Sequence, residues 1–303
     1  MRYLSAAFIL FLGLQIALPA FSAKKQKKNR DEQPAELVFI EKNFSEKSVA
    51  EWESGREFIC VTEELPVFLA INENNQSEQK SFKDKIFVYK ILEEESGWQG
   101  KESYLVFICD GKTYRYKVKK SAAEILNGDF KPLLPELVPL DYIAHADSLL
   151  KGQKLYIKTP RWFDTLGVEI NGRKFVPVTI SSVEAGDKIL PLRVVFEDEA
   201  GMTASVLTTM YKSSLSAQYT SFDRLFTFTD PKLRYPNIKS DVWQQITACK
   251  VAPGMTKDEC RLSVGNPDNV KQMPGYSGLR EQWLYNTGAY LVFQDGLLVD
   301  YRL

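Results

Sequence analysis

Short hydrophobic runs alternate with polar residues between positions 51 and 121 of this chain. A period of two is typical of β-strands that bury one face. The runs lie at 55–61, 67–71, 85–92, 104–109 and 113–118. Asp110-Gly111, between the last two runs, favours a tight hairpin turn. We therefore predict a small β-barrel or β-sandwich module here.

A similar order of runs returns between residues 148 and 215, with a second hairpin signal at Asn171-Gly172. Segments 152–157, 173–176, 192–197 and 209–213 match, in order, 55–60, 85–88, 103–108 and 117–121. The conserved order favours a degenerate tandem repeat, whereas two unrelated β modules of similar composition are the alternative. In size and strand spacing, both copies resemble bacterial Src-homology-3-like small barrels.

Two segments between these regions read as connectors. Residues 122–126 predict one or two helical turns, and Pro132, Pro135 and Pro139 then favour an extended chain, because each proline removes a backbone donor and restrains its predecessor. A second proline-containing stretch, 230–236, leads to the last part of the chain.

From residue 240 the spacing of hydrophobic residues becomes that of helices, and further along it is again that of strands. Ser240 is placed to cap a helix through Ala248. Thr256 and Glu259 have the spacing of a capping box at the start of a second helix, and Gly265 is placed as its left-handed end. Strands are expected at 280–285, 289–293 and 296–301, with turns at 286–288 and 295–296.

This C-terminal part resembles the SmpA/OmlA family, the BamE-like small lipoproteins of outer-membrane assembly, and more loosely the β-lactamase inhibitory proteins of related fold. The resemblance covers about a fifth of the chain and implies an α+β module with two helices and a three-to-four-stranded antiparallel sheet. Its residues are Gly254, Met255, Thr256, Glu259, Gly265, Pro267, Trp283, Tyr285 and Gly296.

The N-terminus has the features of a cleavable signal peptide. Arg2 precedes an apolar run at 4–18, and Ala20 and Ser22 are the small residues expected before a cut at Ala23. A membrane anchor is the alternative, but the run is shorter than the ~20 residues that span a bilayer. The first cysteine is Cys60, so no lipid-anchor cysteine follows the cut. We expect an exported periplasmic or secreted protein without a lipid anchor.

Composition and charge exclude few function classes. The chain has 303 residues, 44% of them hydrophobic, enough to build folded cores. Lys and Arg together number 39, as do Asp and Glu, so no net field attracts nucleic acid, and we expect no nucleic-acid partner. No later segment is apolar enough to span a membrane.

The four cysteines are even in number, and an oxidising compartment permits disulfides. Of the three possible pairings, we favour Cys60–Cys109 with Cys249–Cys260, because each pair then falls within one predicted module. Free thiols are the alternative. The spacing lacks a Cys-x-x-Cys pair, so no metal site is predicted.

Candidate catalytic residues are few. His145 is the sole histidine, and Asp147 follows it closely, but no nucleophile motif accompanies them, so we interpret His145 as a connector residue. Glu93, Glu94 and Glu95 read as a solvated turn. The tyrosines at 114 and 116 alternate with basic residues, which indicates one buried and one solvated strand face, or else a nucleic-acid or glycan surface. No catalytic residue or cofactor is predicted.

Together these features predict two mostly-β small modules followed by an α+β module. The function hypothesis is an exported, non-enzymatic binding or scaffold protein of a bacterial cell envelope, whose partner is another envelope protein. The alternatives are a secreted enzyme inhibitor that uses the C-terminal sheet, and an envelope hydrolase whose carboxylates converge only in the fold. The predicted layout is a signal peptide (1–22), a polar leader (23–50), β module 1 (51–121), a connector (122–147), β module 2 (148–215), a second connector (216–239) and a BamE-like α+β module (240–303).

Overall fold

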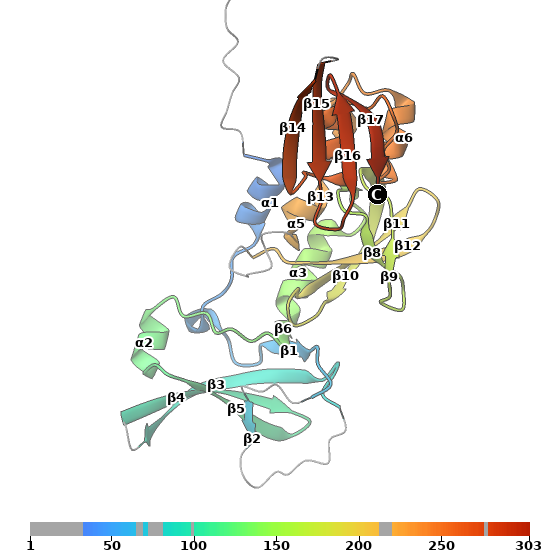
Figure 1. The fold of residues 1–303 in the computed structure, drawn as a ribbon. Coiled ribbons are helices and arrows are strands. Elements are labelled where there is room, and N and C mark those ends of the chain that lie inside the picture. Colours follow the sequence, from blue (N-terminus) through green and yellow to red (C-terminus); the bar gives the residue numbers. More distant parts are fainter. Residues whose placement is uncertain (1–32, 65–68, 72–80, 98–99, 212–219, 276–277) are drawn as a thin grey trace, which may run out of the picture. The chain divides into compact units, whose positions relative to one another are not determined.

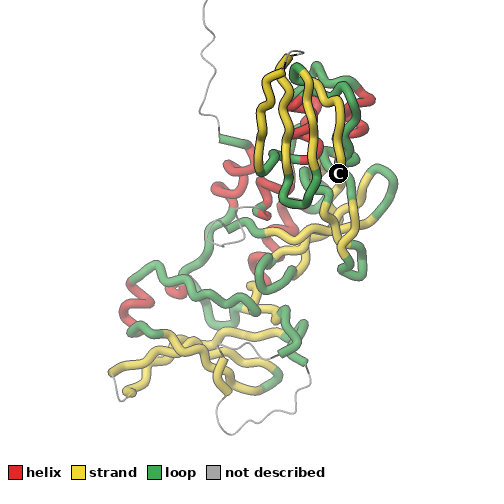
Figure 2. Tube along the Cα trace, in the orientation of Figure 1, coloured by secondary structure: helices red, strands yellow, loops and turns green. Residues whose placement is uncertain are grey.

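The protein is β-rich, as predicted. A computed structural model describes residues 33–64, 69–71, 81–97, 100–211, 220–275 and 278–303 (Figure 1). The predicted signal peptide lies outside these residues. Pro34–Leu303 forms one compact unit, in which the described residues build three sheets and six α-helices (Figure 2). No described helix has the length and apolarity needed to cross a bilayer.

The first sheet has six strands in the order β2-β5-β4-β3-β1-β6, and every neighbouring pair is antiparallel. Its strands are β1 (Glu57–Cys60), β2 (Leu69–Ile71), β3 (Ile86–Gly97), β4 (Gly100–Cys109), β5 (Lys112–Val118) and β6 (Leu137–Pro139). The hairpin predicted at Asp110-Gly111 is confirmed, because both residues have positive φ, 48° and 75°, as a type I′ turn requires. Strand β6 comes from the segment predicted as an extended connector.

The second sheet has seven strands in the order β13-β7-β10-β11-β12-β8-β9. Its strands are β7 (Lys154–Ile157), β8 (Arg161–Phe163), β9 (Glu169–Asn171), β10 (Val176–Ala185), β11 (Leu192–Asp198), β12 (Thr203–Thr208) and β13 (Phe226–Thr227). The hairpin predicted at Asn171-Gly172 is wrong, since β9 ends at Asn171 and the β8–β9 turn holds Gly167. Gly172 serves close packing instead: a Cβ there would lie 2.0 Å from the Trp162 ring.

The strand orders of these two sheets correspond. Strands β5-β4-β3-β1-β6 of the first sheet follow the same path as β12-β11-β10-β7-β13 of the second. Both long central strands also carry a register shift, after Tyr89 and after Ile180. The Gly55 N–H donates to the Tyr89 carbonyl at 2.8 Å, and the Gly152 N–H donates to the Ile180 carbonyl at 2.8 Å. The correspondence therefore extends from topology to single hydrogen bonds.

The third sheet is a four-stranded antiparallel meander that follows two helices. The elements are α6 (Ser240–Thr247), α7 (Lys257–Val264), β14 (Asn269–Gly275), β15 (Gly278–Leu284), β16 (Tyr290–Gln294) and β17 (Leu297–Arg302). The capping box of Thr256 and Glu259 is confirmed. The predicted cap at Ser240 is one residue late, since Lys239 occupies that position. Gly265 has the expected positive φ of 90°, but its ψ of −176° is extended rather than left-handed helical.

Four further helices accompany the first two sheets: α1 (Ala35–Asn43), α2 (Ala122–Asn127), α3 (Leu140–Leu150) and α5 (Phe222–Leu225). Short 3-10 turns cover Val49–Glu51 and Pro231–Arg234. Helix α2 confirms the turns expected after residue 121. Helix α1 lies in the predicted polar leader, where Ile40 and Phe44 are buried in the core of the second sheet. Each sheet has its own hydrophobic core.

Candidate binding site

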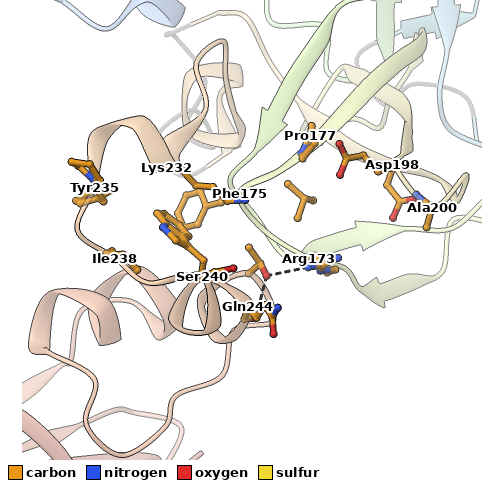
Figure 3. Close-up of a pocket in the computed structure, with 15 residues that line it drawn as sticks. Arg173, Phe175, Pro177, Asp198, Ala200, Lys232, Tyr235, Ile238, Ser240 and Gln244 are labelled. Atoms are coloured by element: carbon orange, nitrogen blue, oxygen red, sulfur yellow. Dashed lines mark hydrogen bonds between the residues drawn. The ribbon is translucent and has the colours of Figure 1, made fainter.

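A cavity of about 450 Å³ lies where the start of β10 meets helix α6 (Figure 3). Its lining comes from four segments: residues 173–177, the β11–β12 turn at 198–200, the chain at 232–238 that leads to α6, and α6 itself. The volume is within the range of about 300–1,000 Å³ that ligand pockets occupy.

Three aromatic residues form one wall of this cavity. The Trp243 ring is buried, and the ring of Phe175 stands edge-on to it with centroids 6.3 Å apart. The Tyr235 ring lies 6.4 Å from Trp243 on the other side. Phe175 has φ 57°, which is rare for a bulky side chain, and such strained residues cluster at binding sites. The wall is thus a rigid apolar surface on which a ligand side chain can pack.

The chain before β10 is held in place by the end of α6. The Lys174 N–H donates to the Thr247 carbonyl at 3.0 Å, and the Arg173 guanidinium donates to the Thr247 hydroxyl at 3.2 Å. A helix leaves its last carbonyls without partners inside the helix, so the Lys174 N–H satisfies a group that needs a donor. Figure 3 shows Arg173 reaching α6 from the β-sheet side. The contact fixes the position of Phe175 against Trp243.

The charged side chains around the cavity differ in whether they have a partner. The Asp198 carboxylate accepts the backbone N–H groups of Ala200 and Met202, both at 2.9 Å, and Glu199 lies 3.8 Å from Lys154. Among the described residues, no carboxylate pairs with the exposed side chains of Arg173 and Lys232. The cavity therefore presents two cations without an ion-pair partner among the described residues, next to an aromatic wall and to the carboxylates of Asp198 and Glu199.

His145 lies in α3, away from this cavity. Its ring is exposed, with Nε2 2.9 Å from the Asn43 carbonyl oxygen, and it contacts the Phe44 ring. Asp147 accepts the Val183 N–H at 2.7 Å instead of orienting the imidazole. The geometry thus gives His145 a contact between α3 and the chain after α1.

The solvated turn predicted for the three glutamates is wrong, because they lie within β3. Alternation along the strand places Glu93 and Glu95 on one face, where both bind the Arg115 guanidinium at 3.1 and 2.6 Å. Glu94 lies on the other face and pairs with Lys101 at 2.6 Å. Their function in the structure is to hold neighbouring strands together.

The tyrosine-rich strand β5 has one buried face and one more solvent-exposed face, as the alternation of tyrosines with basic residues indicated. Tyr114 is fully buried and Val118 is 4% exposed, whereas Lys117 is exposed and pairs with Glu102 at 2.7 Å. Arg115 is paired with β3. This arrangement gives Arg115 and Lys117 partners within the sheet.

The structure contains neither predicted disulfide, and all four cysteines are free. Cys60 on β1 and Cys109 on β4 lie on opposite sides of β3, so the strand spacing separates their Cα atoms by about 10 Å, and a disulfide bridges at most ~7 Å. Cys260 is part of the third core, and Cys249 lies outside that core in a cavity with Lys174.

The motif residues of the C-terminal module have structural roles. Met255 is buried in the third core, and Gly254 and Gly296 have positive φ of 89° and 87°. The fully buried Trp283 donates from its indole N–H to Glu281 at 2.6 Å, and the Tyr285 hydroxyl donates to the Gly265 carbonyl at 3.2 Å. None of the motif residues lines the cavity of Figure 3.

Sequence reasoning missed the cavity, because its lining is drawn from four segments that have no shared motif. The one signal available was the pair of aromatic residues, Tyr235 and Trp243, on either side of the predicted start of α6. Comparison with protein-family models, curated proteins and solved structures finds no match to this chain.

Proposed function

We propose that this chain is an exported, non-enzymatic binding or scaffold protein of a bacterial cell envelope. In this proposal, the cavity lined by Phe175, Tyr235 and Trp243 holds an acidic segment of another envelope protein. The features of a signal peptide at the N-terminus support export. The resemblance of residues 240–303 to BamE-like proteins supports an envelope role, and so does the order of elements there, two helices followed by an antiparallel sheet.

The combination of free cationic charge with an aromatic wall is the observation that carries the ligand assignment. Arg173 and Lys232 attract carboxylates, and the guanidinium of Arg173 presents paired donors that match a carboxylate. The acids of the cavity already hold the β11–β12 turn and Lys154. This use of the acids favours binding over the hydrolase alternative, which needs two carboxylates available to a substrate.

Fluorescently labelled nonapeptides with one phenylalanine flanked by Asp and Glu test the proposal. Fluorescence anisotropy should show binding to the full chain that weakens as salt is added, and the matched Asn/Gln peptide should bind more weakly. Arg173→Glu combined with Lys232→Glu should reduce affinity at least tenfold. Lys151→Glu changes an exposed lysine elsewhere and should leave the affinity unchanged. Equal binding of the acidic and neutral peptides, or an unaffected double variant, would contradict the proposal.

A photocrosslinking amino acid at Gln244, an exposed position in the cavity lining, extends the test to intact cells. We expect a crosslinked product at this position and none with the same residue at Lys151. Peptide mapping of the product should place the crosslink in an acidic segment of an envelope protein. A crosslink to a basic or a cytoplasmic protein would argue against the assignment.

The inhibitor alternative has support in the outer face of the third sheet. Cross-strand register places Met273, Arg280, Gln294 and Leu297 in one row, and the first and last are 41% and 48% exposed. An exposed row of mixed chemistry suits docking against another protein. Loss of an envelope enzyme's activity at one equivalent of this chain, restored by Leu297→Glu, would favour inhibition.

The finer architecture is also part of the proposal. We take the first two sheets as tandem copies of one small β module, because their strand orders and the paired glycine hydrogen bonds correspond.

A further inference from the structure

A second cavity, of about 490 Å³, lies on the other side of the segment that carries Arg173 and Phe175. Lys174 lines it, together with Cys249 and with residues of α7 and the third sheet. Only 9% of Lys174 is exposed to solvent. Lys174 lies between Arg173 and Phe175 in sequence, and it lines this cavity whereas its two neighbours line the first.

The Lys174 side chain has no anion to neutralise it among the described residues. Its backbone N–H binds the Thr247 carbonyl, and its Nζ lies 5.3 Å from the Phe175 ring centroid. No ion pair forms at this ammonium within the part of the chain that the structure describes. A largely buried lysine without a counter-charge is costly, because its ammonium has lost part of its hydration without gaining an equivalent interaction.

Cys249 does not supply that counter-charge at neutral pH. Burial raises the pKa of the Cys249 thiol, and this effect outweighs the opposite effect of the nearby Lys174 ammonium. The thiol therefore stays protonated. Burial also lowers the pKa of Lys174, and that is the direction expected of an ammonium without an anion beside it.

The remaining lining is mostly apolar, and of its three hydroxyl groups, two donate within the protein, whereas that of Thr287 accepts the Ala289 N–H at 3.4 Å. Pro160, Val264 and Leu303 supply apolar surface. The Ser263 hydroxyl donates to the Lys250 carbonyl at 2.5 Å, and the Tyr285 hydroxyl donates to the Gly265 carbonyl. Among the described residues that line this mostly apolar cavity, Lys174 alone has a charged side chain.

We propose that this cavity binds a small monocarboxylate with an apolar body, of the chemical class of a medium-chain fatty acid. The carboxylate pairs with the Lys174 ammonium, and the apolar body packs against Pro160, Val264 and Leu303. The single cation matches a single negative charge, and the shortage of free donors elsewhere disfavours a polyhydroxylated ligand.

Octanoate is the probe, with octanol as the uncharged control, and calorimetry on the full chain measures binding. We expect octanoate to bind and octanol to bind at least tenfold more weakly. Lys174→Met should remove this preference, whereas Lys174→Arg should keep most of it and Lys151→Met all of it. Octanoate should also slow alkylation of Cys249 by iodoacetamide in the unmodified chain, a measurement that does not depend on a variant folding.

Three results would overturn the proposal: no octanoate binding, equal octanoate affinity of the Lys174→Met variant, or alkylation of Cys249 unaffected by octanoate. A peptide with a free C-terminal leucine provides the comparison with another carboxylate source. If it binds more tightly than octanoate and its amidated form does not bind, the site takes a peptide C-terminus rather than a small acid.

Discussion

The Phe175 ring stands at 85° to the Trp243 ring, although its own backbone has φ 57°. A bulky residue in this region costs about 1–3 kcal/mol of strain, so surrounding contacts must offset it. Two such contacts are the edge-on ring packing and the hydrogen bond from the Phe175 N–H to the Ile157 carbonyl at 2.5 Å. The Phe175 ring packs against the third core, and its backbone N–H is bonded to Ile157, a residue of the core of the second sheet.

At Phe175, the usual order of stability, in which an alanine variant is more stable than a glycine variant, should be reversed. Phe175→Ala loses the ring contact and keeps the strain, whereas Phe175→Gly loses the ring and relieves the strain. Glycine ordinarily costs roughly 0.5–1 kcal/mol more than alanine within regular structure. Here urea unfolding should find the glycine variant at least as stable as the alanine variant. An alanine variant clearly more stable than the glycine variant would show that the backbone is not strained.

Gly265 should tolerate neither alanine nor valine. Its φ of 90° and ψ of −176° lie in a region that is essentially restricted to glycine, so either substitution should cost ~1–3 kcal/mol. A Cβ at this position meets no atom within 4 Å, so the loss comes from the backbone and the two variants should be similarly destabilised. Thermal unfolding checks this, and an unchanged melting temperature would contradict the assigned conformation.

Glu281 should make the third module's stability depend on pH. Burial acts to raise the pKa of Glu281, but hydrogen bonds from Lys257 at 2.8 Å and from Trp283 at 2.6 Å outweigh it, and the net pKa is lowered. A lowered folded-state pKa means that the stabilisation is complete above the unfolded value of about 4.3 and is lost as pH falls through the folded value.

Glu281→Gln should therefore lower the unfolding free energy at pH 7 by about 1–3 kcal/mol, because charged hydrogen bonds in a buried site are lost. The difference from the unmodified chain should shrink as the pH falls below the unfolded value of about 4.3, and it should be lost only below the lowered folded value, where the Glu281 carboxyl is neutral in both states. Urea titrations of both proteins at several pH values measure this difference in unfolding free energy. A difference that is constant with pH would show that the carboxylate charge is not stabilising.

The four thiols should differ in reactivity. Burial raises the pKa of Cys109 to about 11 and that of Cys260 to about 12, so few thiolates form at neutral pH. Cys249 is half-buried and should react first with iodoacetamide in the folded chain. In urea without reductant, all four should react. Finding Cys60 and Cys109 linked in a non-reducing peptide map would overturn the structure's assignment.

The features predicted best from sequence are those encoded by neighbouring residues. The capping box at Thr256 and the hairpin at Asp110-Gly111 depend on side chains and turns within a few positions. The same local rule failed at Asn171-Gly172, because the glycine is required by the packing of Trp162, which sequence alone does not reveal.

The candidate site depends on contacts between distant segments, so the pattern of hydrophobic and polar residues along the sequence did not predict it. Arg173 reaches Thr247 across more than seventy positions, and Arg115 joins Glu93 and Glu95 from another strand. Helix α3, which begins after the last proline of the predicted connector, was likewise not predicted, and neither was the pairing of the extended segment β6 with β1. Pro139 in fact ends β6 and precedes α3, a position where a missing backbone donor costs little.

The two short strands β6 and β13 also determine where the chain can be divided for expression. Strand β6 pairs with β1, and β13 pairs with β7, so each sheet is completed by residues that follow its apparent end. A fragment that stops at residue 121 or 215 would leave the backbone groups of β1 or β7 open to pairing with another molecule. A fragment of the first sheet should therefore include β6, which ends at Pro139, and a fragment of the second sheet should include β13, which ends at Thr227.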